Sequence, residues 1–322
     1  MPEDAPDMFN EVLAGERLAL ARLLTLVEND TPKGRAALDY LFPHTGRAHL
    51  IGVTGSPGTG KSSLVNQLAK AFRAAGVEKV AVIAVDPSSP FTGGALLGDR
   101  VRMRDLSGDP GVFIRSMASR GALGGLSRTT ASAAQVLDAA GFDVILIETV
   151  GAGQSEVDVA RLAHTVLVVE APGLGDDIQA IKAGILEIAD ILIVNKCDLP
   201  GAERTARALK AMLEMAHPTK PGMISERDFW MPPVLQACST GCQPVEDILE
   251  AIGRHKEFLK NSGEWQRRER ERLQNNLDAL IRGMLVERFQ AALAPGQYEA
   301  VLNQLTERGV SPFEAAEKLL GE

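Results

Sequence analysis

Cysteine, positive charge and long apolar runs are all scarce in this chain of 322 residues. Its three cysteines, Cys197, Cys238 and Cys242, are too few for a disulfide framework, which predicts a reducing compartment. No apolar stretch approaches the ~18 residues of a membrane-spanning helix, and the acidic first residues lack a secretory leader. A net charge of −8 disfavours a nucleic-acid partner. We therefore expect a cytoplasmic protein that contacts neither membrane nor nucleic acid.

Short apolar runs alternate with helix-like stretches along the middle of the chain. Because these runs are continuously apolar, they predict a parallel sheet that helices cover on both faces. The predicted fold is therefore a doubly wound α/β domain over residues 46–255, with its chemistry beyond the carboxyl ends of the strands. The expected strands cover residues 49–54, 79–85, 142–147, 165–169 and 191–194.

Helical segments flank this domain on both sides. Residues 1–45 are expected to form a helical extension, and residues 256–322 a helical C-terminal arm. In the arm, Leu273, Leu277, Leu280 and Met284 follow at four-three-four spacing. This spacing is typical of a coiled-coil seam and thus of a dimerisation arm. It fits equally well an amphipathic helix that packs on its own domain.

A phosphate-binding loop follows the first expected strand. Residues 55–62 have the pattern G-x-x-x-x-G-K-S between a strand and a helix, the context that a P-loop requires. Its glycines turn backbone N–H groups toward phosphate oxygens. Lys61 is expected to reach the β and γ phosphates, and the Ser62 hydroxyl to ligate Mg²⁺. The candidate nucleotide-binding residues here are Gly55, Ser56, Pro57, Gly58, Thr59, Gly60, Lys61, Ser62 and Ser63.

Two acids stand at the ends of expected strands. Asp86 follows the second strand, and Glu148 opens the sequence Glu-Thr-Val-Gly after the third. Carboxylates there suit Mg²⁺, which keeps several waters and takes few protein ligands. The alternatives are an Asp86 that caps a turn and a solvated Glu148 at a strand end. The nearby P-loop favours the metal role for both.

The sequence Asn195-Lys196-Cys197-Asp198 follows the last expected strand and indicates a guanine-reading loop. A carboxylate at Asp198 accepts two hydrogen bonds from the ring N–H and the exocyclic amine of guanine, a pair that adenine cannot offer. Ala237 and Cys238 occupy the place of the second wall of the base pocket. Together, the two loops predict a GTP-binding protein.

Two further loops combine glycines with charged residues. Residues 92–103 carry Asp99, and residues 173–184 carry Asp176 and Lys182. Loops of this kind can act as switches that order around the γ phosphate and Mg²⁺. The alternative is an ordinary loop followed by a capped helix with Asp176 or Asp177 in its first turn.

These motifs resemble the MeaB/ArgK family of GTPases, which includes the methylmalonic aciduria type A protein. The resemblance implies a homodimer formed through the C-terminal arm, with GTP hydrolysis that is slow until a partner accelerates it. The implied partner is a cobalamin-dependent acyl-CoA mutase, whose adenosylcobalamin loading and repair the GTPase gates. The segments that carry the resemblance are 53–62, 86–89, 92–94, 97–99, 117–125, 150–158 and 171–177.

The resemblance also assigns roles to individual residues. It implies that Mg²⁺ and its water shell are held by Ser62, Asp86, Asp99 and Glu148, and that guanine is read by Asn195, Lys196 and Asp198. It places Asp176 and Lys182 in a switch that responds to the mutase and aids hydrolysis. The catalytic residues that it implies are Lys61, Glu148, Asp176 and Lys182. Mg²⁺ and GTP or GDP are then the ligands of this chain, whereas adenosylcobalamin belongs to the mutase.

Three other functions compete with this interpretation. A nickel-insertion GTPase would share both loops but would need a histidine-rich tract, whereas the five histidines do not cluster in the sequence. An ATP-dependent kinase or transport ATPase is disfavoured by Asn195–Asp198, and an inactive interaction module by the intact Lys61, Ser62 and Asp86. The identity of the client mutase stays open.

Overall fold

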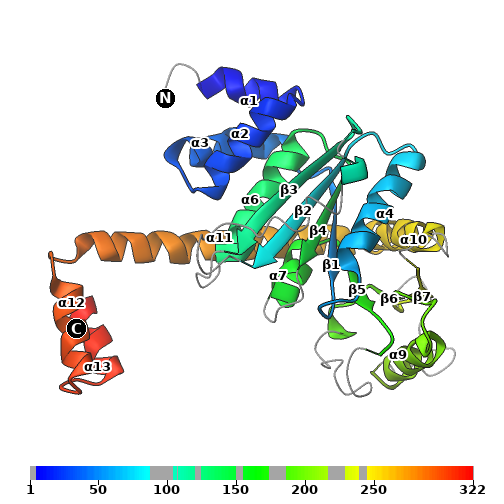
Figure 1. The fold of residues 1–322 in the computed structure, drawn as a ribbon. Coiled ribbons are helices and arrows are strands. Elements are labelled where there is room, and N and C mark those ends of the chain that lie inside the picture. The colour runs from blue at the N-terminus through cyan, green and yellow to red at the C-terminus, as the bar shows by residue number, and fades with distance from the viewer. Residues whose placement is uncertain are drawn as a thin grey trace. The chain divides into compact units, whose positions relative to one another are not determined.

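The computed structural model describes residues 5–87, 104–106, 108–119, 125–149, 155–173, 186–216, 229–238 and 245–321. The chain divides into two units, Met1–Gln274 and Asn275–Glu322 (Figure 1). Asp99, Asp176 and Lys182 lie outside the described residues. The domain boundaries expected at residues 45 and 255 stay predictions.

In the described residues, the first unit contains a seven-stranded sheet in the order β3-β2-β4-β1-β5-β6-β7 (Figure 1). All neighbouring strands are parallel. This arrangement confirms the predicted doubly wound α/β fold. The strands are β1 His49–Thr54, β2 Val80–Pro87, β3 Val112–Ser119, β4 Val144–Thr149, β5 Thr165–Glu170, β6 Ile191–Val194 and β7 Val234–Gln236.

The two outermost strands are the ones that the apolar pattern does not predict. β3 pairs with β2 from Val112 to Ser119, but Arg115 and Ser116 interrupt its apolar residues. β7 is three residues long and only half-buried. An edge strand is covered less completely than a central one, so it does not need a continuous apolar run.

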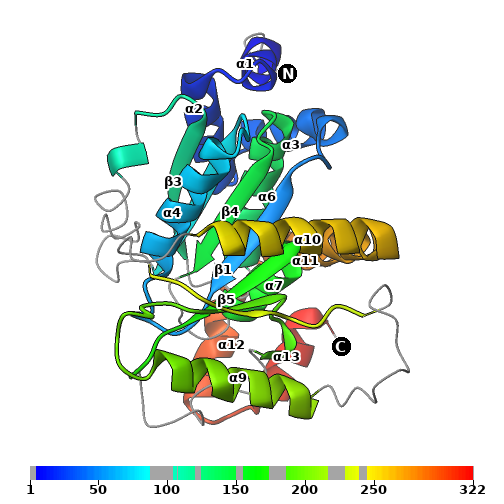
Figure 2. The same ribbon diagram turned by 90° about the vertical axis from the view of Figure 1, so that its right-hand side faces the viewer.

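Helices cover both faces of the sheet, and Figure 2 views it from the side of α4 and α10. In β1, Leu50 belongs to the hydrophobic cluster of α2 and α6, whereas its neighbour Ile51 packs in the cluster of α4 and α10. Successive side chains of a strand face opposite sides, so both faces of β1 must be apolar. The helices are α1 Ala5–Leu13, α2 Arg17–Glu28, α3 Pro32–Leu41, α4 Lys61–Ala74, α6 Gly125–Ala139, α7 Ser155–Leu162, α9 Ala202–Ala216, α10 Glu246–Ser262, α11 Glu264–Ala292, α12 Gln297–Thr306 and α13 Pro312–Leu320, with short 3₁₀ turns η1 Phe42–His44 and η2 Arg104–Leu106.

The helical N-terminal extension is interrupted by a turn between α2 and α3. Asp30, with φ +50°, ends the turn after α2, and Thr31 caps α3 by accepting a hydrogen bond from the N–H of Gly34 at 3.0 Å. Pro32 occupies the first position of α3, where its missing N–H costs nothing. The three helices share one hydrophobic cluster with α6, so they pack directly on the α/β domain.

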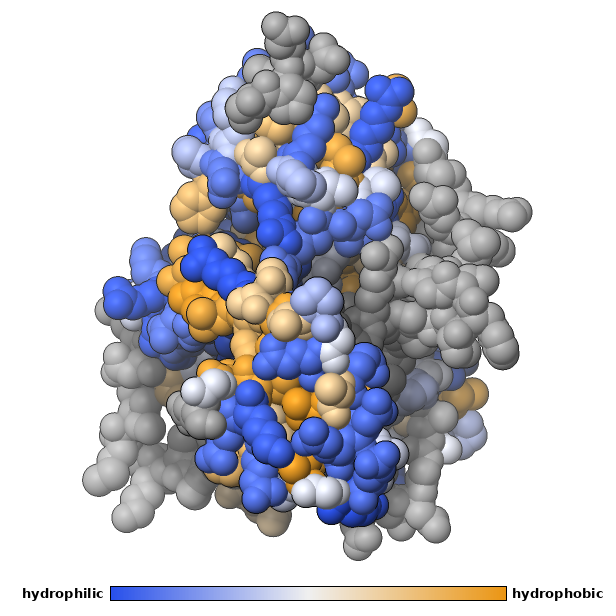
Figure 3. Space-filling model, turned by 90° about the vertical axis from the view of Figure 1, so that its left-hand side faces the viewer, coloured by the Kyte–Doolittle hydropathy of each residue, from blue (hydrophilic) through white to orange (hydrophobic). Residues whose placement is uncertain are grey.

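The second unit exposes many large hydrophobic residues. None of the residues of α11 is buried. Figure 3 shows one face of the molecule, on which apolar residues (orange) lie among hydrophilic ones (blue). α13 begins with a capping box between Ser311 and Glu314, which satisfies the backbone donors of its first turn. None of the helices in the described part of the chain combines the length and apolar content that crossing a bilayer requires.

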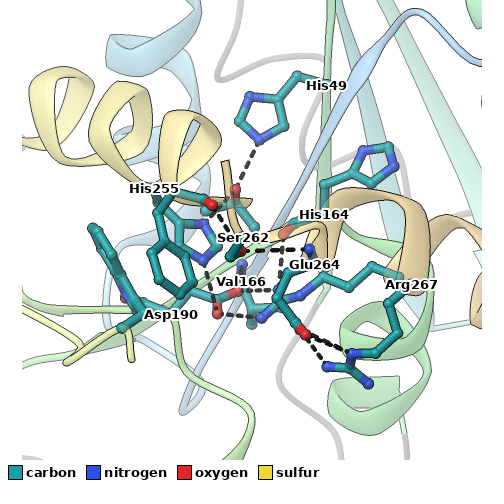
Figure 4. A network of polar contacts seen from close by, with 12 residues as sticks. His49, His164, Val166, Asp190, His255, Ser262, Glu264 and Arg267 are labelled. Atoms are coloured by element: carbon teal, nitrogen blue, oxygen red, sulfur yellow. Dashed lines mark hydrogen bonds and ion pairs between the residues drawn. The ribbon is translucent and has the colours of Figure 1, made fainter. Parts of the chain in front are cut away.

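A buried carboxylate organises the amino-terminal edge of the sheet. Asp190, the residue before β6, accepts two hydrogen bonds from Arg268 at 2.7 and 2.8 Å and one from the N–H of Val166 at 2.8 Å. The His255 Nε2 atom lies 3.2 Å from it. The indole of Trp230 donates to the Asp190 carbonyl at 2.7 Å. Asp190 thereby joins β5, α10 and the first turns of α11 within the first unit (Figure 4).

Histidines extend this network across the sheet (Figure 4). The Thr165 hydroxyl lies 2.7 Å from Nε2 of His49 and 2.9 Å from Nδ1 of His255. His49 and Thr165 are 116 residues apart in the chain, so sequence order does not predict this grouping. His49, His164 and His255, which are far apart in the sequence, therefore lie close together in the fold. Within the described residues, no His, Cys, Asp and Glu side chains are grouped as metal ligands.

His164 connects the network to the beginning of α11. Its Nδ1 accepts a hydrogen bond from the N–H of Leu50 at 3.1 Å, so Nε2 carries the proton and faces Glu269 at 3.2 Å. Its ring stacks on Trp265 with 4.0 Å between the ring centroids. His164 is thus fixed as one neutral tautomer.

Burial and hydrogen bonds shift the pKa values of His49, His164 and Asp190 in this network. Burial, and after it the electrostatic effect of a proton on the neighbouring His164, lower the pKa of His49 well below its ordinary value. Burial also lowers the pKa of His164, although its hydrogen bond to Glu269 opposes the shift. Burial raises the pKa of Asp190, but hydrogen bonds from His255 and Arg268 outweigh it and lower that pKa to about 2.

We expect the free energy of unfolding to fall as the pH drops below about 6.5. Because the fold lowers the pKa of His49 and His164, the unfolded chain takes up protons at these residues more readily than the folded chain below that pH. Their contribution is fully present above pH 6.5 and is lost below it, by up to about 1.4 kcal/mol per pH unit for each histidine. Urea unfolding at pH 7, 6 and 5, followed by tryptophan fluorescence, measures the loss. Both tryptophans, Trp230 and Trp265, contact the network.

Two variants distinguish the contribution of the network histidines to the pH dependence of stability from that of an exposed histidine. His49→Gln should flatten the pH dependence, because the amide still reaches Thr165 but does not titrate. His44→Gln changes an exposed histidine and should leave the dependence as it is. Equal stability of the unchanged protein at pH 7 and pH 5 would contradict the lowered pKa values of His49 and His164.

Candidate nucleotide-binding site

The P-loop connects the carboxyl end of β1 to the first residue of α4, as the sequence predicts. Gly55, Gly58 and Gly60 have positive φ angles of 133°, 78° and 91°. A Cβ atom on Gly55 would lie 2.0 Å from the carbonyl oxygen of Val169 in β5. Gly60 directly precedes α4, so the N–H groups of the first helical turn face the loop. Glycine at position 55 is therefore required by both the backbone conformation and the available space.

Lys61 lies inside the loop and is only 5 % exposed. Its Nζ atom donates to the carbonyl oxygens of Gly55 and Ser56, each at 2.9 Å. The Thr59 hydroxyl donates to the Ser56 carbonyl at 3.0 Å. A buried ammonium beside the P-loop is well suited to bind anionic phosphate oxygens.

The Ser62 hydroxyl donates to Oε1 of Glu148 at 2.5 Å. Glu148 stands next to Val53 of β1 in the strand register, and its neighbour Thr149 donates to the Thr54 hydroxyl at 3.1 Å. Mg²⁺ prefers oxygen ligands and takes few from the protein. This hydroxyl and carboxylate therefore fit a magnesium site beside the P-loop.

The other predicted metal ligands are less fully described. Asp86 lies in β2 opposite Ala118 of β3, at the same edge of the sheet, but its side chain is outside the description. Asp99 lies outside the described residues, as do Asp176 and Lys182. Ser63 is exposed on α4, and Pro57 is exposed at the tip of the loop.

The predicted guanine loop begins directly after β6 and is attached to the P-loop. Asn195 is fully buried, and its Nδ2 donates to the Thr59 carbonyl at 2.7 Å. Lys196 has φ +56°, and its Nζ donates to the Gly58 carbonyl at 2.7 Å. The two loops, separated by more than 130 residues, therefore form one structure.

Asp198, the last residue of the predicted guanine loop, is exposed and contacts the segment that follows β7. The N–H of Cys197 donates to the Ala237 carbonyl at 3.0 Å. The buried Cys238 thiol donates to Oδ1 of Asp198 at 3.2 Å. The structure thus brings Asn195, Lys196, Asp198, Ala237 and Cys238 to the same edge of the sheet as the P-loop.

Glu170 is a site residue that the sequence analysis misses. It ends β5, is only 7 % exposed, and accepts a hydrogen bond from the Ser56 hydroxyl at 3.3 Å. Its carbonyl accepts the N–H of Asn195 at 2.7 Å. The signal was an acid after an apolar strand, the same signal that identifies Asp86 and Glu148.

Comparisons with known proteins show the family of this chain. Residues 20–294 match the family model described as "Methylmalonyl Co-A mutase-associated GTPase MeaB". The chain belongs to the MeaB family. Membership confirms the resemblance stated from the sequence and identifies the chain as a GTPase.

Individual relatives of this MeaB-family chain match it over nearly its whole length. A Pyrococcus abyssi protein is 44% identical over 98% of this chain and 96% of its own length. The Caenorhabditis elegans protein named "Methylmalonic aciduria type A homolog, mitochondrial" is 31% identical over 97% of this chain and 81% of its own. The crystal structure of a protein described as a LAO/AO transport system kinase is similar with a TM-score of 0.71, 28% identity and coverage of 100% of this chain and 98% of its own.

For this MeaB-family GTPase we expect Gly55→Ala to cost at least about 2 kcal/mol of stability and most of the GDP affinity. The added Cβ meets the Val169 carbonyl, and a positive φ adds strain of about 1–2 kcal/mol. Thermal unfolding and GDP titration measure the two effects. Gly76→Ala is the matched control, because Gly76 has φ +89° with nothing within 4 Å of its Cβ position. It should lose only the strain energy and keep GDP affinity; equal behaviour of the two variants would refute the steric explanation.

Proposed function

We propose that this GTPase gates adenosylcobalamin loading of a cobalamin-dependent acyl-CoA mutase of the methylmalonyl-CoA mutase type, and protects or reactivates that mutase. The observation that carries the proposal is the family match over residues 20–294, whose description names an association with methylmalonyl-CoA mutase. The name of the Caenorhabditis elegans relative supports the same partner. The client is thus an acyl-CoA mutase, and the cobalamin belongs to it.

The P-loop residues of this chain bind and orient the triphosphate. Lys61 exchanges its bonds to the Gly55 and Ser56 carbonyls for bonds to the β and γ phosphate oxygens. Ser62 and Glu148 hold Mg²⁺ and its water shell, together with Asp86 and Asp99. Bound there, Mg²⁺ neutralises charge on the phosphate oxygens. Glu148 also accepts a hydrogen bond from a water on the γ-phosphate side.

Selectivity for guanine comes from the second loop. Asp198 accepts hydrogen bonds from N1–H and the 2-amino group of guanine, while Lys196 lies along the base and Asn195 braces the P-loop. Ala237 and Cys238 form the second wall of the pocket. Adenine offers an acceptor where guanine offers N1–H, so Asp198 repels it.

Partner control is proposed for residues outside the described part of the chain. Asp176 and Lys182 belong to the segment that responds to the mutase, and Lys182 supplies positive charge to the transferring phosphoryl group. Hydrolysis needs positioning and charge neutralisation rather than a covalent intermediate. A lysine that the partner moves into place therefore explains slow hydrolysis alone and fast hydrolysis in the complex.

The C-terminal unit is proposed to form the homodimer. On α11, five exposed apolar side chains follow the spacing of one helix face, with exposures from 38 % at Leu280 to 58 % at Leu285. A second copy of the same face covers this stripe in a symmetric interface. The stripe consists of Leu277, Leu280, Ile281, Met284 and Leu285.

GTP hydrolysis by the purified protein should be slow alone and rise at least about tenfold with one cobalamin-dependent acyl-CoA mutase of the same organism. The assay measures phosphate release with each such mutase in turn. Lys182→Ala should keep GTP affinity and abolish the stimulation, whereas Lys210→Ala, on the exposed side of α9, should retain it. Hydrolysis that no mutase changes would contradict the partner assignment, and stimulation of Lys182→Ala would contradict the role of Lys182.

Ile281→Asp should convert a dimer into a monomer, because it places a charge in the centre of the apolar stripe. Analytical ultracentrifugation measures the mass of each species. Arg282→Glu changes an exposed residue beside the stripe and should leave the dimer intact. A protein that is monomeric before any substitution would refute the dimer.

A further inference from the structure

The thiol of Cys238 contacts the carboxylate that is proposed to read guanine. Cys238 is fully buried, and its Sγ atom donates to Oδ1 of Asp198 at 3.2 Å. Asp198 itself is exposed. The carboxylate torsion of an exposed aspartate is broad, so such a group samples many orientations. A donor fixed in the core restricts that freedom.

The backbone around Cys238 sets the position of the thiol. The N–H of Ala237 donates to the Val194 carbonyl at 2.9 Å, and the N–H of Cys197 donates to the Ala237 carbonyl at 3.0 Å. These two bonds attach the segment after β7 to the loop after β6. They hold the backbone on both sides of the contact between Cys238 and Asp198.

The rest of the base loop is attached by other contacts. Asn195 and Lys196 donate to the P-loop carbonyls of Thr59 and Gly58, each at 2.7 Å. These bonds fix the backbone that leads to Asp198 but not the rotation of its carboxylate. The thiol acts on that remaining freedom.

A thiol suits this task because it is a weak donor. An ionised carboxylate has about four lone-pair positions, and the thiol occupies one on Oδ1. Oδ2 and the second position on Oδ1 stay available to two donors of a ligand. A lysine at position 238 would instead neutralise the carboxylate and compete with the base.

We propose that Cys238 is a positioning residue for base selectivity, which orients the Asp198 carboxylate so that it accepts both guanine donors at once. This inference rests on the proposed contact between Asp198 and guanine. Hypoxanthine has N1–H but lacks the 2-amino group of guanine. The ratio of GDP to IDP affinity therefore measures the hydrogen bond between Asp198 and the 2-amino group. That bond depends on the orientation of the Asp198 carboxylate.

Isothermal titration of the full-length protein with GDP, IDP and ADP tests the proposal. Cys238→Ala should lower the ratio of GDP to IDP affinity by about threefold to tenfold, because GDP loses the alignment of two bonds and IDP that of one. Cys238→Ser should restore most of the ratio, since a hydroxyl also donates to Asp198. ADP should bind far more weakly than GDP to the unchanged protein.

Val245→Ala is the control for general loosening of the core. Val245 is buried in the same hydrophobic cluster as Ala237, so the variant should lose stability and keep the GDP to IDP ratio. Equal losses for GDP and IDP in Cys238→Ala, or no rescue by Cys238→Ser, would overturn the positioning role while guanine reading stands. Equal affinity of the unchanged protein for GDP and ADP would overturn guanine reading, and the role of Cys238 with it.

Discussion

The contact between Gly55 and the end of β5 is the constraint on which the nucleotide site depends. β1 lies between β4 and β5, so the chain that leaves β1 at Gly55 passes directly beside Val169 of β5. A Cβ atom on Gly55 would lie 2.0 Å from the Val169 carbonyl oxygen. This close approach places the loop between Glu148, which binds Ser62, and Glu170, which binds Ser56. A larger residue at position 55 would separate the loop from both acids. The geometry of the site therefore follows from strand order together with one missing side chain.

The amino-terminal ends of the strands, on the opposite edge of the sheet, are connected by hydrogen bonds between polar side chains and the backbone. Arg268 and Val166 bind Asp190, and Thr165 lies between His49 and His255. β5 has six residues, which span only about 20 Å. The same short strand thus begins in the histidine network and ends at the P-loop. Because α11 begins at this network, β5 connects the first turns of α11 to the nucleotide loops.

The features predicted from sequence are those that local pattern determines. Continuous apolar runs identify five strands, and the spacing of Gly55, Lys61 and Ser62 identifies the P-loop, because both depend on neighbouring residues. β3 and β7 escape this rule, since an edge strand tolerates residues such as Arg115. The contacts of Glu170, Cys238 and the histidines depend on register and on chain segments far apart in sequence. No local pattern encodes which strands become neighbours, so these contacts follow only from the fold.

The carbonyl groups of the P-loop accept hydrogen bonds that orient the backbone of the loop for an anion. Lys61 donates hydrogen bonds to the carbonyls of Gly55 and Ser56. Lys196 donates to the carbonyl of Gly58, and Asn195 donates to that of Thr59. In a planar trans peptide, the N–H of the next residue points away from the carbonyl. Holding the carbonyls of Gly55 and Thr59 therefore turns the N–H groups of Ser56 and Gly60 to the other side. Because Asn195 and Lys196 supply two of these bonds, the base loop also shapes the phosphate cradle, and a change in either loop is transmitted to the other.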